Sequence, residues 1–496
     1  MSARRKSKPL FDASAWDFKT LKRTHAAIEE VALGDLGLDI YPTQIEIISA
    51  EQMLDAYSSI GMPLMYRHWS FGKKFLRDEK AYRKGHSGLA YEIVINSNPC
   101  ISYLMEENSM AMQTLVMAHA AFGHNHFFKN NYLFRQWTDA DGILDYLEFA
   151  KGHVAKCEER HGIDAVEAIL DAAHALMDHG VFRYRRPPMR TAEEEKKRER
   201  ERHDYEERTF NDLWRTLPAD DSEKSPSDSE VQKRKKGLHL PEENLLYFVE
   251  TYSPILEPWQ REILGIVRFI AQYFYPQKQT RVMNEGAACF VHYHVVNALF
   301  DKGLLSEGAV LEILHSHSNV IFQPDFDDPR FSGFNPYALG LAMMEDIRRI
   351  ATDPTDEDRA WFPTLAGSGD WCAALKHAWA NFRDESFIQQ YLSPRLIRKF
   401  RLFGVADDAA ESHVTVSAIH DEDGYRRVRD TLARSYDVGV VEPNIQVVDV
   451  DLRGDRHLCL QHTVRDGVPL DKSDGDAVLA HLRRLWGYDV TLEAVS

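Results

Sequence analysis

Residues 101–131 read ISYLMEENSMAMQTLVMAHAAFGHNHFFKNN, and they carry the main fold signal of the chain. Met, Leu and Ala dominate positions 101–122, which predicts one long buried helix that ends at a histidine cluster. Upstream, LAYEIVI at 89–95 is apolar and β-branched, and it predicts a buried strand that stops at Asn-Ser-Asn-Pro. Downstream, 258–274 and 282–299 predict two more long apolar helices. We therefore expect a mainly α-helical domain with a few strands.

Composition divides the chain into segments. The stretch 191–236 includes EEEKKRERERHDYEER and DDSEKSPSDSE, which cannot bury enough apolar surface to offset its ordering entropy, so we expect a flexible insertion. It separates two parts of the helical domain, 16–190 and 237–400. From about 405 to 496, strands and helices are expected in the order βαββαβ, which is the ferredoxin-like pattern. The expected fold class is α+β, with this small domain following the helical one.

The composition argues against several classes of protein. The 496 residues include 60 basic and 77 acidic side chains, a net charge of -17, which argues against a nucleic-acid or anionic-membrane binder. Five scattered cysteines without a CxxC pair predict a reduced, cytoplasmic protein. The basic N-terminus has no apolar stretch after it, and no window resembles a spanning helix, so we expect no membrane insertion. Phosphate-binding glycine loops, nucleophile elbows and kinase signatures are also missing from the sequence.

The histidine cluster at 117–131 contains His119, His124 and His126. On a continuous α-helix His119 and His126 lie nearly above one another, whereas His124 points about 140° away from His119. All three converge only if the helix ends near Gly123, which is free to break it.

A second cluster, RVMNEGAACFVHYHVV at 281–296, places Glu285 and His292 on one helical face. Imidazoles and carboxylates at helical spacing are typical ligands of zinc, iron or manganese in helical proteins. The spacing therefore predicts a divalent metal site with ligands from both clusters. Its candidate ligands are His119, His124, His126, Glu285 and His292. The alternative is that these histidines are satisfied polar groups along a buried seam.

The hydrolytic interpretation needs a general base from another segment. Ala120 follows His119, whereas a zincin helix has Glu beside its first His. We consider Glu107, Asp141 and Glu148 for this role. The alternative for Asp141 and Glu148, which share a helical face with Asp145, is an ordinary solvated acidic surface.

A polar-aromatic string at 61–75, GMPLMYRHWSFGKKF, resembles the lining of a pocket. It adds Arg67 and His68 to the candidate catalytic residues.

Four strings make the sequence similar to the SpoVR family, named for stage V sporulation protein R. They are YPTQIEIISAEQMLDAYSSIGMPLMYRHWSFGK, LAYEIVINSNPCISYLMEEN, AHAAFGHNHFFKNNYLFRQWTDADGILDYLEFA and MNEGAACFVHYHV, and the resemblance covers about 16–480. It implies a link to spore cortex formation in spore formers. In other bacteria it implies a stress and stationary-phase role beside a PrkA-like serine kinase and a von Willebrand A-like protein. It implies no catalytic residues.

Two functions therefore remain open. The first is a cytoplasmic metal-dependent hydrolase that acts on a peptide- or amide-like substrate linked to cell-envelope metabolism, such as spore cortex or peptidoglycan. The second is a non-catalytic regulatory or scaffold protein that works with the kinase and the von Willebrand A-like protein. A stoichiometric metal distinguishes them, because only the first function requires one.

Overall fold

The computed structural model describes residues 8–59, 62, 65–84, 91–183, 238, 240–406, 410, 412, 415–418, 421–451, 454–465 and 469–495. The expected insertion at 191–236 lies outside these residues. The chain divides into two compact units, Met1–Leu170 with Gln272–Glu442 and Asp171–Ala271 with Pro443–Ser496. Helices α8 (Ile163–Ala175) and α12 (Pro258–Gln279) have residues in both. No helix among the described residues combines the length and the apolar character that a membrane crossing requires.

The first unit is mainly helical. Its other α-helices are α1 (Phe18–Glu29), α2 (Ala50–Ser58), α3 (Trp69–Arg83), α4 (Met110–Val116), α5 (Asn125–Asn130), α6 (Tyr132–Trp137), α7 (Ile143–His161), α13 (Arg281–Asp301), α14 (Glu307–Val320), α15 (Pro336–Thr352), α16 (Asp356–Trp361), α17 (Trp371–Asn381), α18 (Asp384–Tyr391), α19 (Pro394–Lys399), α20 (Glu422–Ser435) and α21 (Val438–Val441). Two π-helical segments, η1 (Glu30–Asp35) and η2 (Met117–His124), interrupt the regular helices.

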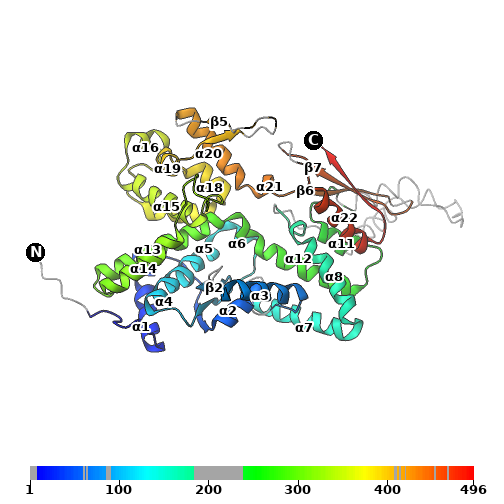
Figure 1. The fold of residues 1–496 in the computed structure, drawn as a ribbon, viewed down its shortest axis with the longest axis horizontal. Helices are drawn as coiled ribbons and strands as arrows, with labels where there is room; N and C mark the ends of the chain where they lie inside the picture. The colour runs from blue at the N-terminus through cyan, green and yellow to red at the C-terminus, as the bar shows by residue number, and fades with distance from the viewer. Residues whose placement is uncertain are drawn as a thin grey trace, which may run out of the picture. The chain divides into compact units, whose positions relative to one another are not determined.

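Helix α13 is the central helix of this unit and packs against η2 and α15. Figure 1 shows α13 beside α15. Glycines permit the close approach on each side. A Cβ added to Gly123 would lie 2.6 Å from the Cα of Ala288, and one added to Gly286 would lie 2.5 Å from the carbonyl carbon of Gly340. Side chains of α13 that flank these contacts therefore come within reach of those on η2.

A three-stranded sheet lies beside η2. Its order is β1 (Thr43–Ile48), β3 (Cys100–Met105), β2 (Glu92–Ile95), with β1 parallel and β2 antiparallel to β3. The expectation of a helix over 101–122 is wrong in its first part, because these residues enter β3 and α4 begins only at Met110. Pairing on both sides of β3 favours the strand, and the Ser109 side chain, which accepts a hydrogen bond from Met112 N, caps the new helix.

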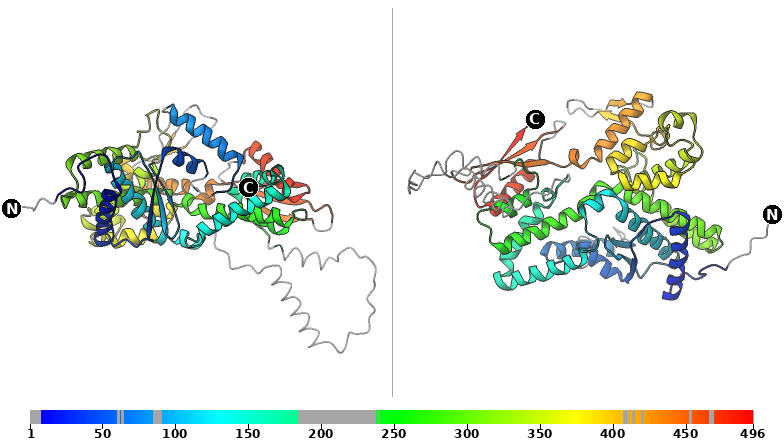
Figure 2. Two further views of the ribbon diagram at one scale, coloured as in Figure 1. Left: turned by 90° about the horizontal axis from the view of Figure 1, so that it is seen from below. Right: turned by 180° about the vertical axis from the view of Figure 1, so that it is seen from behind.

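The second unit contains a separate C-terminal sheet. Its order is β6 (Asn444–Val450), β7 (Leu458–Thr463), β8 (Val490–Val495), with α22 (Lys472–Trp486) packed beside β8, and these elements lie together in both views of Figure 2. The unit also contains α11 (Leu245–Tyr252) and the short η3 (Met177–His179).

The described residues do not form the expected ferredoxin-like sheet. The strand expected at 414–419, β5 (Thr415–Ala418), pairs with β4 (Gly404–Ala406) in a two-stranded sheet of the first unit. All six expected elements occur in the expected order, with the short α21 added between α20 and β6, but order alone does not specify strand partners. The protein is nevertheless α+β, with a small C-terminal three-stranded sheet.

Candidate metal centre

The π-helical segment η2 brings His119 and His124 together. Hydrogen bonds in a π-helix join residues five apart, so His119 and His124 lie over one another instead of about 140° apart as on an α-helix. Their ring centroids are 4.6 Å apart with the planes at 89°. Both side chains are buried. A local change of helix type therefore makes a two-histidine site from residues that an α-helix would separate.

Two carboxylates from other elements face this pair. Glu285 Oε2 on α13 lies 3.6 Å from His124 Nε2 and 3.8 Å from His119 Nε2. Glu92 Oε1 on β2 lies 3.8 Å from His119 Nε2. Ligands around a tetrahedral cation at about 2.1 Å lie roughly 3.4 Å from one another, so small side-chain movements would complete such a site. The set His119, His124 and Glu285 therefore has the donor types and the spacing of a metal centre.

Glu285 Oε2 is a buried atom without a hydrogen-bond partner among the described residues. Burial by itself raises the pKa of Glu285, but the neighbouring imidazoles and the Tyr337 hydroxyl outweigh it, and the pKa falls below its ordinary value. Glu285 is thus a carboxylate with one oxygen oriented toward two imidazoles and left without a partner, which is costly unless a cation satisfies it.

The protonation of His124 supports the same conclusion. His124 Nδ1 lies 2.8 Å from Asn284 Oδ1, so Nδ1 donates and Nε2 presents a lone pair to Glu285. Burial lowers the pKa of His124 to about 4, which keeps the ring neutral. A neutral imidazole lone pair and a carboxylate oxygen repel one another at this distance unless a cation lies between them.

His119 is held by a chain of imidazoles. Its Nδ1 lies 2.9 Å from His292 Nδ1, and His292 Nε2 lies 2.7 Å from His317 Nδ1. Burial disfavours the charged form of His119, but the neighbouring Cys289, Glu285 and Glu92 side chains outweigh it and raise its pKa well above the ordinary value. The two carboxylates therefore favour a positive charge at this position. Metal-binding histidines usually donate their second ring N–H to such a partner.

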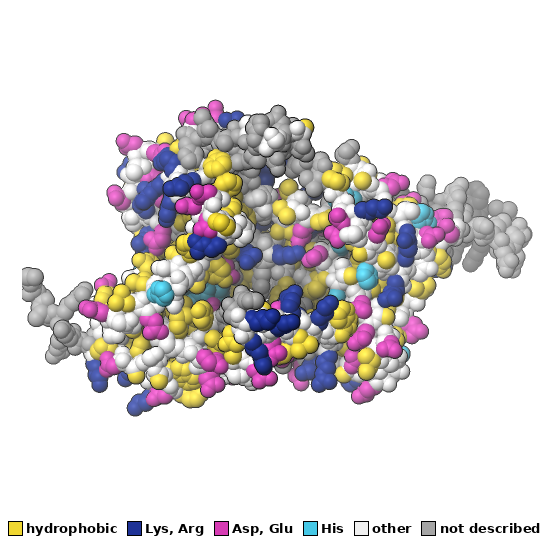
Figure 3. Space-filling view, viewed as in Figure 1, with side chains coloured by type: hydrophobic (Ala, Val, Ile, Leu, Met, Phe, Trp, Pro, Cys, Tyr) yellow, Lys and Arg dark blue, Asp and Glu magenta, His cyan; other side chains and the backbone are white. Residues whose placement is uncertain are grey.

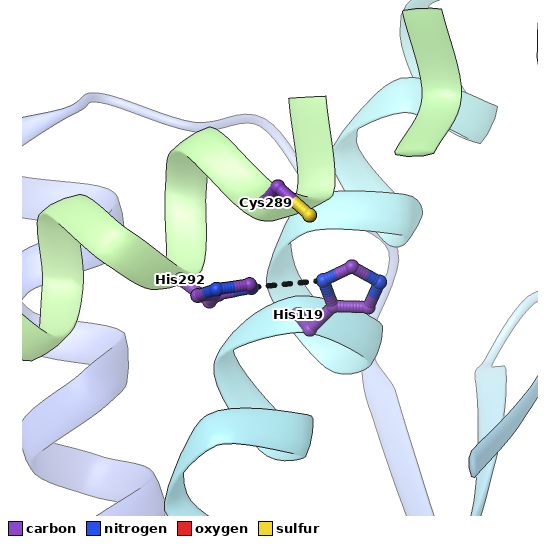
Figure 4. Close-up of side chains that lie close together, drawn as sticks. All are labelled: His119, Cys289 and His292. Carbon is purple, nitrogen blue, oxygen red and sulfur yellow. Dashed lines mark hydrogen bonds between the residues drawn. The ribbon is translucent and has the colours of Figure 1, made fainter. Parts of the chain in front are cut away.

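A second set of donors, His119, Cys289 and His292, also lies within ligand distance (Figure 4). All three are buried, and burial raises the pKa of Cys289, which keeps it a thiol. The 2.9 Å separation of the two Nδ1 atoms is that of a hydrogen bond. A cavity lies beside His124 and Glu285, whereas neither Cys289 nor His292 lines it. We therefore favour the His119, His124 and Glu285 set as the one that a substrate reaches.

A cavity of about 420 Å³ adjoins this set. Its lining residues are Tyr57, Met62, Lys74, Glu92, Ile93, Val94, Ile95, His124, Phe128, Tyr273, Phe274, Gln277, Asn284, Glu285 and Tyr337. Aromatic walls with a few convergent polar groups are typical of small-molecule sites.

Comparisons with known proteins assign the chain to a family. A family model described as SpoVR like protein matches residues 15–441, and one described as SpoVR-like C-terminal domain matches residues 443–496. The chain belongs to the SpoVR family. It is 55% identical over 484 residues to the "Uncharacterized protein YcgB" of Escherichia coli (strain K12), and the match covers 98% of this chain and 93% of that protein. No solved structure matches. The family expected from the sequence is confirmed, and it supplies no reaction.

The structure brings together four of the five expected metal ligands, which are His119, His124, Glu285 and His292. It does not bring His126 to them, because the π-helical turn directs this residue elsewhere. His126 Nδ1 accepts a hydrogen bond from Asp39 N at 3.0 Å, and its ring packs edge-on against Trp379. Burial lowers the pKa of His126 to about 4, as expected of a neutral core histidine.

The expected catalytic carboxylates lie away from the cavity. Glu107 accepts a hydrogen bond from Ala50 N at 3.3 Å, and Asp141 accepts one from Asn98 Nδ2 at 2.7 Å. Glu148 is exposed on α7. None of these three lines the cavity.

The two residues expected from the polar-aromatic string do not line the cavity either. Arg67 is exposed, and the buried His68 has its Nδ1 2.7 Å from Ser70 Oγ. Lys74, from the end of the same string, does line it.

Sequence reasoning missed Glu92, Asn284 and Tyr337 in this SpoVR-family chain. Glu92 could have been identified from the sequence, because it is the one charged residue in the apolar strand sequence LAYEIVI. Asn284 directly precedes Glu285 and could have been found as a neighbour of that carboxylate. Tyr337 comes from α15, far along the chain, and no local pattern connects it to the site.

Proposed function

We propose that this chain is a metal-dependent hydrolase that cleaves an amide bond of a small peptide- or amide-like substrate. One observation carries the proposal: Glu285 Oε2 is buried and unpartnered among the described residues, and it faces the Nε2 atoms of His119 and His124 beside a cavity. A cation there would have three protein ligands and open positions toward the cavity. That arrangement is typical of zinc or iron sites that activate water.

Glu92 is the candidate general base. It lines the cavity next to His119, and burial raises its pKa, which makes its carboxylate a better proton acceptor. A cation held by His119, His124 and Glu285 would polarise a water, and Glu92 would take a proton from that water as the water's oxygen bonds to the amide carbonyl carbon. The C–N bond then breaks, and the leaving amine takes the proton from Glu92. Carboxylic acid and amine are the products.

Metal analysis and an amine-release assay test this function together. We expect about one divalent cation per chain in protein purified without a His tag, and release of amine from a panel of dipeptides and N-acetylated amino acids. Glu92→Gln should retain the metal and lose amine release. Metal-free wild-type protein with an intact fold would support the regulatory or scaffold alternative, and metal-loaded protein inactive on the whole panel would refute the hydrolase.

Family resemblance supports the remaining parts of the proposal. It implies a protein that works beside a PrkA-like serine kinase and a von Willebrand A-like protein in stress or cell-envelope physiology, and the five scattered cysteines favour a cytoplasmic location. Co-purification of tagged chain with those two proteins from stationary-phase cells would test the partnership. If neither co-purifies, the partnership is refuted while the hydrolase stands.

A further inference from the structure

The charges around the cavity are unevenly distributed. Glu92 and Glu285 lie at the candidate metal centre, and Lys74 is the one Lys or Arg among the described residues that line the cavity. Both Lys74 and the two carboxylates line this one cavity of about 420 Å³, which is large enough for a small molecule that contacts both.

Lys74 is positioned by α2 but keeps donors available. Its Nζ donates to the backbone oxygen of Tyr57 at 2.9 Å and lies 5.9 Å from the centroid of the Tyr57 ring. An ammonium has three donors, and the described residues provide no further hydrogen-bond or ion-pair partner for Lys74. Two N–H bonds are therefore left for a ligand.

The helix that carries Lys74 is basic in an acidic protein. Helix α3, WSFGKKFLRDEKAYR, has five Lys or Arg residues against one Asp and one Glu, whereas the whole chain has a net charge of -17. Ion pairs within the helix, Arg77 with Asp78 and Arg83 with Glu79, neutralise two of these cations. Lys and Arg side chains gather over α3 in Figure 3. Such a patch raises the local concentration of anions at the cavity.

We propose that the cavity binds substrates that carry a free carboxylate, with Lys74 as the group that recognises it. This inference rests on the proposed function, since it places the carboxylate at Lys74 and the scissile amide at the His119, His124 and Glu285 centre. A single ammonium matches the single charge of a carboxylate. A phosphate, with a charge of about -1.5 to -2, would be repelled more strongly by the two cavity carboxylates. The substrate class is therefore N-acyl amino acids or peptides with a free C-terminus.

A matched pair of hydroxamates tests the proposal on zinc-loaded full-length protein. Succinic acid monohydroxamate and butyrohydroxamate both present a hydroxamate to the metal, and they differ only by a carboxylate in place of a methyl group. By calorimetry we expect wild type to bind the first about tenfold more tightly, as for a hydrogen bond to a charged group. Lys74→Met should abolish this preference. Lys73→Met should keep it, because Lys73 lies over the Trp69 ring and does not line the cavity.

The outcomes separate this inference from the function on which it rests. If wild-type protein binds no metal, the proposed function and the inference both fail. If it binds metal but shows equal affinity for the two hydroxamates, or if Lys74→Met keeps the preference, only the inference fails. If 3-phosphonopropionyl hydroxamate binds more tightly than succinic acid monohydroxamate, and if that binding depends on Lys74, the cavity recognises a phosphate-type group and the carboxylate proposal is wrong. Lys74→Gln replaces Lys74→Met if the latter does not fold.

Discussion

His124 Nε2 lies 3.6 Å from Glu285 Oε2, and both atoms are electron-pair donors because the proton of His124 is on Nδ1, bonded to Asn284. Two lone pairs in a buried position are unfavourable unless a positive charge lies between them. A proton on the neighbouring His119 supplies part of that charge in the metal-free chain, and a divalent cation would supply more of it while using all three donor atoms.

The first prediction is that metal content depends on these donors. His124→Ala and Glu285→Gln should each weaken zinc affinity by more than about 100-fold, because even partners outside the ligand set cost 10–100-fold. Elemental analysis after dialysis against a fixed zinc concentration measures the loss. His315→Ala removes an exposed histidine of α14 that belongs to neither donor set, and it should leave metal content unchanged. Equal zinc content in all four proteins would contradict the site.

A second prediction concerns the residue that orients His124. Asn284→Ala removes the acceptor of the His124 Nδ1 proton but no metal ligand, so zinc affinity should fall by about 10–100-fold while thermal stability changes little. Asn297→Ala is the matched control, since Asn297 lies on the same helix and donates to the Tyr293 backbone oxygen. Calorimetric titration of zinc compares the two. If both variants bind like wild type, Asn284 does not position His124.

The candidate site could be predicted in part because its residues stand out locally. Charged and imidazole groups inside apolar helices indicated His119, His124, Glu285 and His292. Their mutual arrangement could not be predicted, because helical-wheel reasoning assumes about 100° per residue, and the π-helical segment replaces this with a five-residue spacing. In the π-helical segment His124 lies over His119, whereas an α-helix would place His126 there.

The fold shows the same division between local and long-range information. Helix α13 and strand β2 follow from apolar patterns in their own residues. The strand β3 and the separation of β5 from the C-terminal sheet depend on which strands pair, and pairing is decided by partners distant in the sequence. Glu92 enters the site for that reason: β2 pairs with β3, and both lie against η2.

The third prediction tests the close packing of α13. In Gly286→Ala the new Cβ would lie 2.5 Å from the carbonyl carbon of Gly340, so α13 and α15 must move apart at a cost of about 1–3 kcal/mol. Because Glu285 is adjacent, zinc affinity should fall as well. Gly308→Ala on α14 meets open space and should be neutral or stabilising by up to about 1 kcal/mol. Urea unfolding of both variants measures this, and equal stabilities would refute the packing argument.

The fourth prediction concerns Asp384, the buried carboxyl at the start of α18. It accepts backbone N–H bonds from Val282 at 2.8 Å and Met283 at 2.9 Å, and so holds the first turn of α13. Burial raises the pKa of Asp384 to about 7, although the two N–H bonds act in the opposite direction. Between its unfolded pKa and pH 7 the folded chain therefore binds a proton that the unfolded chain has released.

The sign of the pH dependence follows from this difference. Where the folded state binds more protons, the free energy of unfolding decreases as pH rises, by about 1.4 kcal/mol per pH unit for one group. The difference in unfolding free energy between wild type and Asp384→Asn should therefore decrease from pH 5 to pH 7 and level off at about pH 8, where Asp384 is mostly ionised in both states. Urea unfolding of both proteins at pH 5, 6, 7 and 8 measures it. A difference that stays constant from pH 5 to pH 7 would show that Asp384 is already ionised in the fold, with the two N–H bonds of α13 outweighing its burial.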